Sequence, residues 1–231
     1  MSSKIKAGIS ILLLVGLIAL LHKTNVLLEE RIINKNDLKE TFKYMNTSSV
    51  IIDPGHGGID DGKIGVNGEK EKDINLNISL KIKKILEEND IEVVMTREED
   101  GRLADSQTED LKARVDVMNR VRPVLAVSIH QNSYHDAEIS GAQVFYHSSS
   151  EEGRRAAEMI RDGIRSADPA QDRENKANDS YYILKYSEVP AVIVECGFLS
   201  NPAEAERLAD GEYQEKIAGA VAAGILQYIN D

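Results

Sequence analysis

The sequence predicts an α/β domain built around a mostly parallel β-sheet. Three short apolar runs, at 50–52, 124–127 and 191–194, suit central strands that are covered on both faces. Stretches with a helical pattern separate these runs, as in chains whose parallel strands are joined by helical crossovers. Residues 49–231 are therefore expected to form one domain of ordinary size, with helices on both faces of the sheet.

The predicted elements alternate along the domain, with a glycine-rich loop after the first strand. The predicted strands cover residues 50–52, 91–96, 124–130, 141–147 and 190–196. The predicted helices cover residues 71–88, 109–120, a long stretch from 151, 203–209 and 213–229. This order favours short connections and a single sheet.

The amino terminus differs in composition from the rest of the chain. Two lysines, at positions 4 and 6, precede AGISILLLVGLIALL (Ala7–Leu21), an uncharged apolar run that is followed by His22 and Lys23. We interpret residues 1–23 as a signal anchor or a signal peptide, because the run has the length of a signal-peptide core and could span a bilayer with flanking lysines. Residues 24–48 are polar and charged, and we expect a linker or stalk. Either interpretation predicts export, with the domain secreted or membrane-anchored outside the cytoplasmic membrane.

Charge and cysteine content exclude several classes of protein. The net charge is −11, and residues 1–48 have seven basic and four acidic residues, which leaves 21 basic and 35 acidic residues for the domain. Such an acidic domain is not expected to bind nucleic acid, which requires basic surface. The single cysteine, Cys196, excludes an internal disulfide and a multi-cysteine zinc site.

Imidazole and carboxylate side chains stand where the three central strands are predicted to end. His56 follows the first strand in DPGHGG, His130 ends the second in SIHQNS, and Glu195 ends the third in VECGFLSN. Ligands bind outside the carboxyl ends of the strands in open α/β sheets, so these side chains are expected to meet. Glu71, in GEKEKDINL, begins the first helix and is expected close to the loop that contains His56.

Two imidazoles and one carboxylate match the ligand set of a hydrolytic zinc ion that keeps one position for water. Zinc would lower the pKa of that water to about 7 and polarise a carbonyl group. A second carboxylate would then serve as general base and later as general acid. The residue types alone do not decide which glutamate binds the metal.

Two other groups near these motifs have simpler interpretations. Asp53 is expected to shape the turn before Pro54, or to orient a metal-binding side chain by a hydrogen bond without binding the metal itself. Three tyrosines precede the last central strand, and we interpret them as packing residues in a segment where a substrate wall could stand: Tyr181, Tyr182 and Tyr186.

The motifs VIIDPGHGG, GEKEKDINL, SIHQNS and VPAVIVECGFLSNPAEAERL together resemble the zinc-dependent N-acetylmuramoyl-L-alanine amidases of the amidase-3 type, from Ser49 to the carboxyl terminus. The resemblance implies an α/β fold with a mixed sheet. It implies one zinc ion on His56, Glu71 and His130, with Glu195 as the catalytic carboxylate. The implied reaction is hydrolysis of the amide between the lactyl group of N-acetylmuramic acid and the L-alanine of the stem peptide in peptidoglycan.

A short chain with an amino-terminal hydrophobic segment and no wall-binding repeats is similar to the spore-cortex type within this family. That similarity implies removal of stem peptides so that muramic-δ-lactam forms and the cortex is marked for lysis at germination. A membrane link through the amino-terminal segment and an activating partner protein are further expectations.

Two rival interpretations have different chemistry. In the first, Cys196 is the nucleophile of an exported hydrolase and His130 is its base, which would make activity sensitive to iodoacetamide and insensitive to EDTA. In the second, the chain is a cell-wall-binding module without turnover. A complete set of two histidines and two glutamates argues against the second interpretation, whereas sensitivity to a chelator decides the first.

Overall fold

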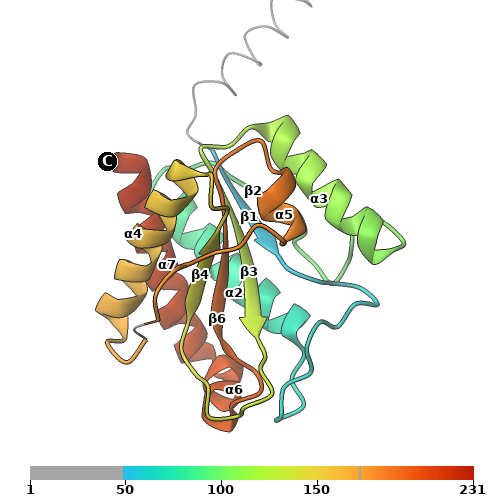
Figure 1. Cartoon of the computed structure of the whole chain (residues 1–231), viewed down its shortest axis with the longest axis vertical. Helices are drawn as coiled ribbons and strands as arrows, with labels where there is room; N and C mark the ends of the chain where they lie inside the picture. The colour runs from blue at the N-terminus through green and yellow to red at the C-terminus, as the bar shows by residue number, and fades with distance from the viewer. Residues whose placement is uncertain (1–48, 172) are drawn as a thin grey trace, which may run out of the picture. The chain divides into compact units, whose positions relative to one another are not determined.

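The computed structural model describes residues 49–171 and 173–231, and a six-stranded sheet runs through the centre of this part (Figure 1). The strand order is β2-β1-β3-β6-β4-β5. The strands are β1 (Val50–Pro54), β2 (Val93–Met95), β3 (Leu125–Asn132), β4 (Gln143–Tyr146), β5 (Lys176–Ala177) and β6 (Ala191–Phe198). Only the β4–β6 pairing of this sheet is antiparallel, which confirms the predicted mixed, mostly parallel α/β fold.

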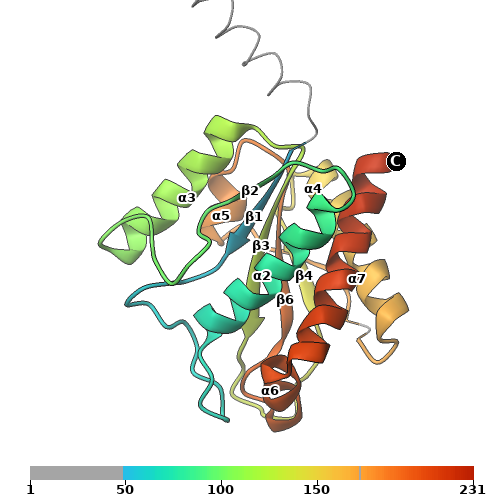
Figure 2. The same cartoon turned by 180° about the vertical axis from the view of Figure 1, so that it is seen from behind.

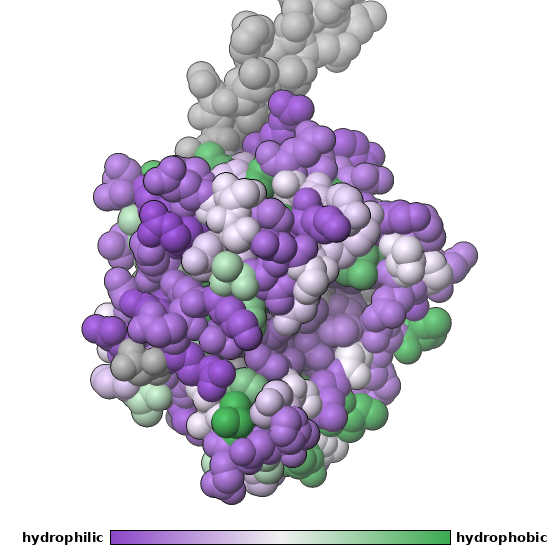
Figure 3. Space-filling model, viewed as in Figure 1, coloured by the Kyte–Doolittle hydropathy of each residue, from purple (hydrophilic) through white to green (hydrophobic). Residues whose placement is uncertain are grey.

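Helices cover both faces of the sheet (Figures 1 and 2). On one face lie α2 (Glu71–Glu87), α4 (Glu151–Ala167) and α7 (Gly211–Asn230). On the other lie α3 (Gln107–Val121) and the short α5 (Tyr182–Tyr186). The remaining helix, α6 (Pro202–Ala209), leads from β6 into α7. The surface in Figure 3 is mostly hydrophilic with scattered hydrophobic residues, as the charge content of the domain leads one to expect.

The alternation of side chains along the strands builds two core layers. Val50 and Ile52 of β1 pack with α2, α4 and α7, whereas Ile51 between them packs with α3 and α5. All three side chains are fully buried. Successive strand residues face opposite sides of a sheet, so β-branched residues at consecutive positions fill both layers.

Side chains cap the starts of most of the helices, and α2 is an instructive exception. The side chains of Ser106, Ser150 and Asp210 cap α3, α4 and α7 by accepting a backbone N–H from three residues later. Helix α2 lacks such a side-chain cap at Lys70 and begins directly with Glu71. An acidic residue in the first turn is favoured by the helix dipole, and here it is also free to face the loop after β1.

Two short elements were not predicted, and the amino-terminal predictions are not tested. Strand β5 and helix α5 span two and five residues, too few for a periodic pattern to show. The predicted signal segment (1–23) and linker (24–48) lie outside the described residues. Among the residues that are described, no helix is long and apolar enough to cross a membrane.

Candidate active site

The three central strands bring their site residues to one edge of the sheet. Strands β1, β3 and β6 are adjacent and parallel, and His130 of β3 is paired in register with Glu195 of β6. Both strands run two residues past their predicted ends, so these residues lie within strands rather than at the strand ends. The side chains of paired residues face the same side of a sheet, which places this imidazole and this carboxylate side by side.

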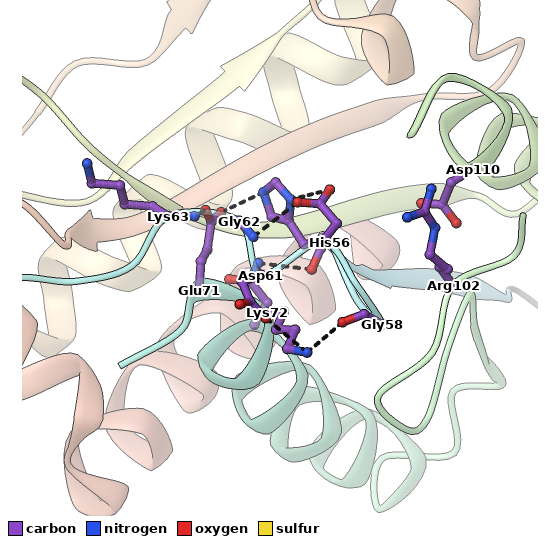
Figure 4. Close-up of polar contacts among 12 residues, drawn as sticks. His56, Gly58, Asp61, Gly62, Lys63, Glu71, Lys72, Arg102 and Asp110 are labelled. Carbon is purple, nitrogen blue, oxygen red and sulfur yellow. Dashed lines mark hydrogen bonds and ion pairs between the residues drawn. The ribbon is translucent and has the colours of Figure 1, made fainter. Parts of the chain in front are cut away.

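His56, Glu71 and His130 converge on one carboxylate oxygen. The Oε1 atom of Glu71 lies 3.2 Å from Nε2 of His56 and 3.0 Å from Nδ1 of His130. One potential ligand atom from each residue lies within 4.8 Å of the others, which is a geometry that could hold a metal ion. Figure 4 shows Glu71, at the start of α2, pointing to the His56 ring. The structure therefore assembles the predicted ligand group, while its metal occupancy stays a prediction.

The Glu71 carboxylate is buried and charged. Its Oε1 atom also accepts the Gln131 backbone N–H at 3.1 Å, and Oε2 accepts the Lys63 N–H at 2.8 Å. Burial alone would raise the pKa of Glu71, but hydrogen bonds from His130 and His56 hold that pKa well below its usual range. An ionised carboxylate between two imidazoles suits a divalent cation.

Asp60 orients the first histidine, and the sequence analysis missed it. Its Oδ2 atom lies 3.0 Å from Nδ1 of His56, the nitrogen that faces away from Glu71. A carboxylate at one ring nitrogen fixes the tautomer and leaves the other nitrogen for a metal. Although burial lowers it, Glu71 and Asp60 together raise the pKa of His56 to about 9. Among so many acidic residues, only the four-residue spacing from His56 could have singled out Asp60.

Two buried arginines hold the backbone of the loop that carries His56. The carbonyl oxygen of Pro54 accepts from Arg97 Nε at 3.0 Å and from Arg114 Nη1 at 2.8 Å. The next carbonyl, of Gly55, accepts from Arg97 Nη2 at 3.0 Å. The carbonyl of His56 accepts from Arg114 Nη2 at 2.7 Å. His56 has φ +61°, a conformation that is costly for a residue with a side chain, so these contacts fix a backbone that would otherwise relax.

Asp53 acts on this loop through Arg114. The Asp53 side chain is fully buried and accepts from Thr96 at 2.6 Å, from Ser128 at 2.6 Å and from Arg114 at 2.7 Å. Burial opposes its charge, yet Arg114 and the two hydroxyls hold the pKa of Asp53 below its usual value. Asp110 binds the same guanidinium at 2.7 Å. Asp53 thus anchors the arginine that holds the carbonyl of His56.

Arg114→Lys should weaken metal binding by about 10- to 100-fold, the usual effect of losing a group that orients a ligand. Lysine keeps the charge beside Asp53, but a single ammonium cannot reproduce the planar fork that reaches Pro54 and His56. The dissociation constant for zinc, measured by competition with a chromophoric chelator, tests this. Arg120→Lys, exposed on the same helix, is the matched control and should bind zinc like the unchanged chain. Equal affinity in both variants would contradict a role for Arg114.

Glu195 is a buried carboxylate with an unused oxygen. Its exposed fraction is 8%, and no described residue donates a hydrogen bond to its Oε2 atom. Burial is the main reason why the pKa of Glu195 is raised, to about 7. Glu195 and His130 line a cavity of about 150 Å³ between α3 and α5. A buried polar atom without a partner is costly in a folded protein, so this oxygen is available for a ligand or a water molecule.

Cys196 does not share the properties of a nucleophile. Its side chain is fully buried in the core layer formed by α2, α4 and α7, whereas Ile193 of the same strand packs on the other face. Burial raises the pKa of the thiol to about 12, so the reactive thiolate is not formed near neutral pH. The structure therefore opposes the cysteine interpretation.

Cys196→Ala should leave the reaction rate of the folded protein unchanged and lower its free energy of unfolding by about 1 kcal/mol, as expected when a buried group of methylene size is lost. Denaturant unfolding and an activity assay on the same preparation measure the two effects. A folded variant without activity would restore Cys196 as a candidate nucleophile.

The fold and the site together define an α/β protein with three residues that could hold a metal ion and a buried carboxylate beside them. The family model described as N-acetylmuramoyl-L-alanine amidase matches residues 50–227, so the chain belongs to that family. The chain is therefore a peptidoglycan amidase, an enzyme that hydrolyses the bond between N-acetylmuramic acid and L-alanine. The interpretation as a binding module without turnover is wrong.

Named relatives support this assignment. The germination-specific N-acetylmuramoyl-L-alanine amidase of Bacillus subtilis is 36% identical over 190 residues, which are 79% of this chain and 80% of the relative. The CwlD amidase from Clostridioides difficile, solved in complex with the GerS lipoprotein, matches with a TM-score of 0.76 and 36% identity over 80% of this chain and 99% of that one. AmiC2 of Nostoc punctiforme matches with a TM-score of 0.72 and 34% identity, over 79% and 97% of the two chains.

Proposed function

We propose that this amidase holds one zinc ion with His56, Glu71 and His130. The observation that carries the proposal is the convergence of both imidazoles on the Oε1 atom of Glu71, at 3.2 and 3.0 Å. The donor set fits the ion, because neutral imidazole and carboxylate are common zinc ligands in sites that keep an open position. When bound, zinc supplies Lewis-acid polarisation of the substrate carbonyl.

Glu195 is the proton carrier in this proposal. It lies in register with His130, and its Oε2 atom has no donor among the described residues, so it can bind a water or the substrate nitrogen. As general base it takes a proton from the attacking water, and as general acid it returns that proton to the L-alanine nitrogen when the bond to the lactyl carbonyl breaks. Asp60, Arg97 and Arg114 keep His56 in position meanwhile.

The biological setting we propose is the spore cortex. The support is the germination-specific relative, together with the CwlD amidase, whose structure contains a lipoprotein. In this setting the enzyme removes stem peptides so that muramic-δ-lactam forms. It acts outside the cytoplasmic membrane, and residues 1–23 either anchor it in that membrane or direct its secretion. An activating partner protein is part of the same proposal.

Mass spectrometry of digested cortex peptidoglycan tests the chemistry. The full chain should release stem peptides that begin with free L-alanine, lose this activity with EDTA and regain it when zinc is added. Iodoacetamide should have no effect. Activity that survives EDTA and is abolished by iodoacetamide would overturn the zinc assignment. Cortex that retains its δ-lactam after deletion of the gene would overturn the spore role and leave the chemistry intact.

A further inference from the structure

The turn between His56 and Asp60 has little side-chain surface with which to hold its place. Gly57 and Gly58 have φ angles of +134° and +57°, and Ile59 is 85% exposed. The turn is closed on itself, because Gly57 and Asp60 exchange backbone hydrogen bonds at 3.0 and 3.1 Å. With so little of the turn buried, its position relative to the sheet depends on polar contacts with other segments.

Lys72 and Asp100 bind both backbone groups of Gly58. The Nζ atom of Lys72 donates to the Gly58 carbonyl oxygen at 2.6 Å, and Figure 4 shows this side chain reaching from α2 to that carbonyl. The Gly58 N–H donates to Oδ1 of Asp100 at 2.8 Å. An ion pair of 2.9 Å between Lys72 and Asp100 completes the set. We call these three residues the Gly58 clamp.

The environment of Lys72 differs from that of Lys70, two residues before it. The Lys72 side chain is 7% exposed and that of Lys70 is 45% exposed. Both contact Asp61, at 3.1 and 3.2 Å, so the contacts with Gly58 and Asp100 are what distinguish them. A lysine is rarely buried unless its charge is paired, and here the buried ammonium is paired within the Gly58 clamp.

The Gly58 clamp joins the His56 loop to the loop that follows β2. Asp100 lies in that second loop, and a Cβ atom at Gly57 would lie 2.1 Å from the carbonyl oxygen of Gly101. The two loops therefore meet backbone to backbone, at a place where only glycine fits. The loop after β2 thus supports the turn that places Asp60 beside His56.

We propose that the Gly58 clamp is a positioning device for the metal site. By fixing the turn, it keeps Asp60 against Nδ1 of His56 and leaves Nε2 of that ring turned towards the other ligands. This inference rests on the proposed zinc site. Loss of a group that orients a ligand weakens metal binding by about 10- to 100-fold, and the clamp acts one step further out, so we expect about tenfold.

Lys72→Met removes the ammonium group and keeps a side chain of similar length. The full chain with this change should bind zinc about tenfold more weakly, measured by competition with a chromophoric chelator. Cobalt(II) bound in place of zinc should give a changed visible spectrum, because the His56 ring is no longer held in one orientation. Lys70→Met is the matched control: it removes the same charge and a contact with Asp61, and it should leave the affinity and the spectrum unchanged.

A double-mutant cycle separates positioning from a general loss of stability. Asp100→Ala should weaken zinc binding by a similar factor, and its side chain is 51% exposed, so this variant tests the clamp independently of how well Lys72→Met folds. The double variant should be little weaker than either single one, because the two residues act on Gly58 as a unit.

The outcomes of these measurements are distinct. Additive losses of affinity, or an unchanged zinc affinity in both single variants, would overturn the clamp and leave the zinc site intact. Equal weakening in Lys70→Met and Lys72→Met would attribute the effect to charge alone and overturn the clamp as well. An unchanged chain that binds neither zinc nor cobalt would instead contradict the proposed function.

Discussion

Glu195→Gln should keep the full zinc content and lose hydrolysis by about 10²- to 10⁴-fold, the usual range for general acid–base assistance. Glutamine has nearly the same volume, and His56, Glu71 and His130 are unchanged. An amide, however, cannot accept a proton from water or return one to the departing L-alanine nitrogen. The effect should therefore appear in kcat, because the lost interaction belongs to the transition state.

Zinc by atomic absorption and stem-peptide release should be measured on one preparation of this variant. Glu195 is buried beside His130, so circular dichroism is needed to show that the variant is folded. Loss of zinc from a folded Glu195→Gln protein would make Glu195 a ligand. Full activity with full zinc would remove it from the reaction.

Glu71→Ala should lose zinc and activity together. The Oε1 atom of Glu71 is the point on which both imidazoles converge, and alanine leaves only two of the three ligands. A three-ligand site that loses its only carboxylate also loses the negative charge that attracts the cation. We expect less than a tenth of the zinc content of the unchanged chain after dialysis, and activity reduced in proportion.

Glu69→Ala is the matched control for this loss, because Glu69 is exposed and lies two residues before Glu71. It should keep both zinc and activity. A folded Glu71→Ala protein with full zinc would exchange the proposed roles of the two glutamates. The same result in Glu69→Ala as in Glu71→Ala would attribute the loss to the loop rather than to the ligand.

The parts of the site that the sequence predicts are those that local patterns control. Val50, Ile51 and Ile52 predict a strand that is covered on both faces, and all three are buried in the structure. The proline and glycines that follow them indicate where this strand ends. The same kind of run precedes His130 and Glu195. Because parallel strands end at a common edge, three such runs are enough to bring these residues together before any side-chain contact is known.

The residues that support the site could not be predicted, because they act across long separations in the sequence. Arg114 reaches the carbonyl oxygen of a residue 58 positions earlier, and Arg97 reaches one 43 positions earlier. Both bind backbone oxygens, which every residue possesses, so no spacing or residue type marks the acceptor. Asp60 could not be predicted for a different reason: the domain has many acidic residues, and no pattern distinguishes this one from the others.

Strand β4 runs antiparallel to β6, so it ends at the end of the sheet that lies opposite the site residues. The loops at the two ends of the sheet therefore differ in how far their sequences can vary. The end of β4 at Tyr146 is paired with Val192, at the opposite end of β6 from Phe198. The turn that follows, between β4 and α4, therefore lies at the amino-terminal end of β6, whereas Glu195 lies towards its carboxyl end. Loops at that end of the sheet can vary in length, or receive a fluorophore or an affinity tag, where they keep the contact of Ser148 with Asp179, which precedes Tyr181 in the wall of the Glu195 cavity. The loops near Glu195 and His56 are more constrained because they carry or border the site residues.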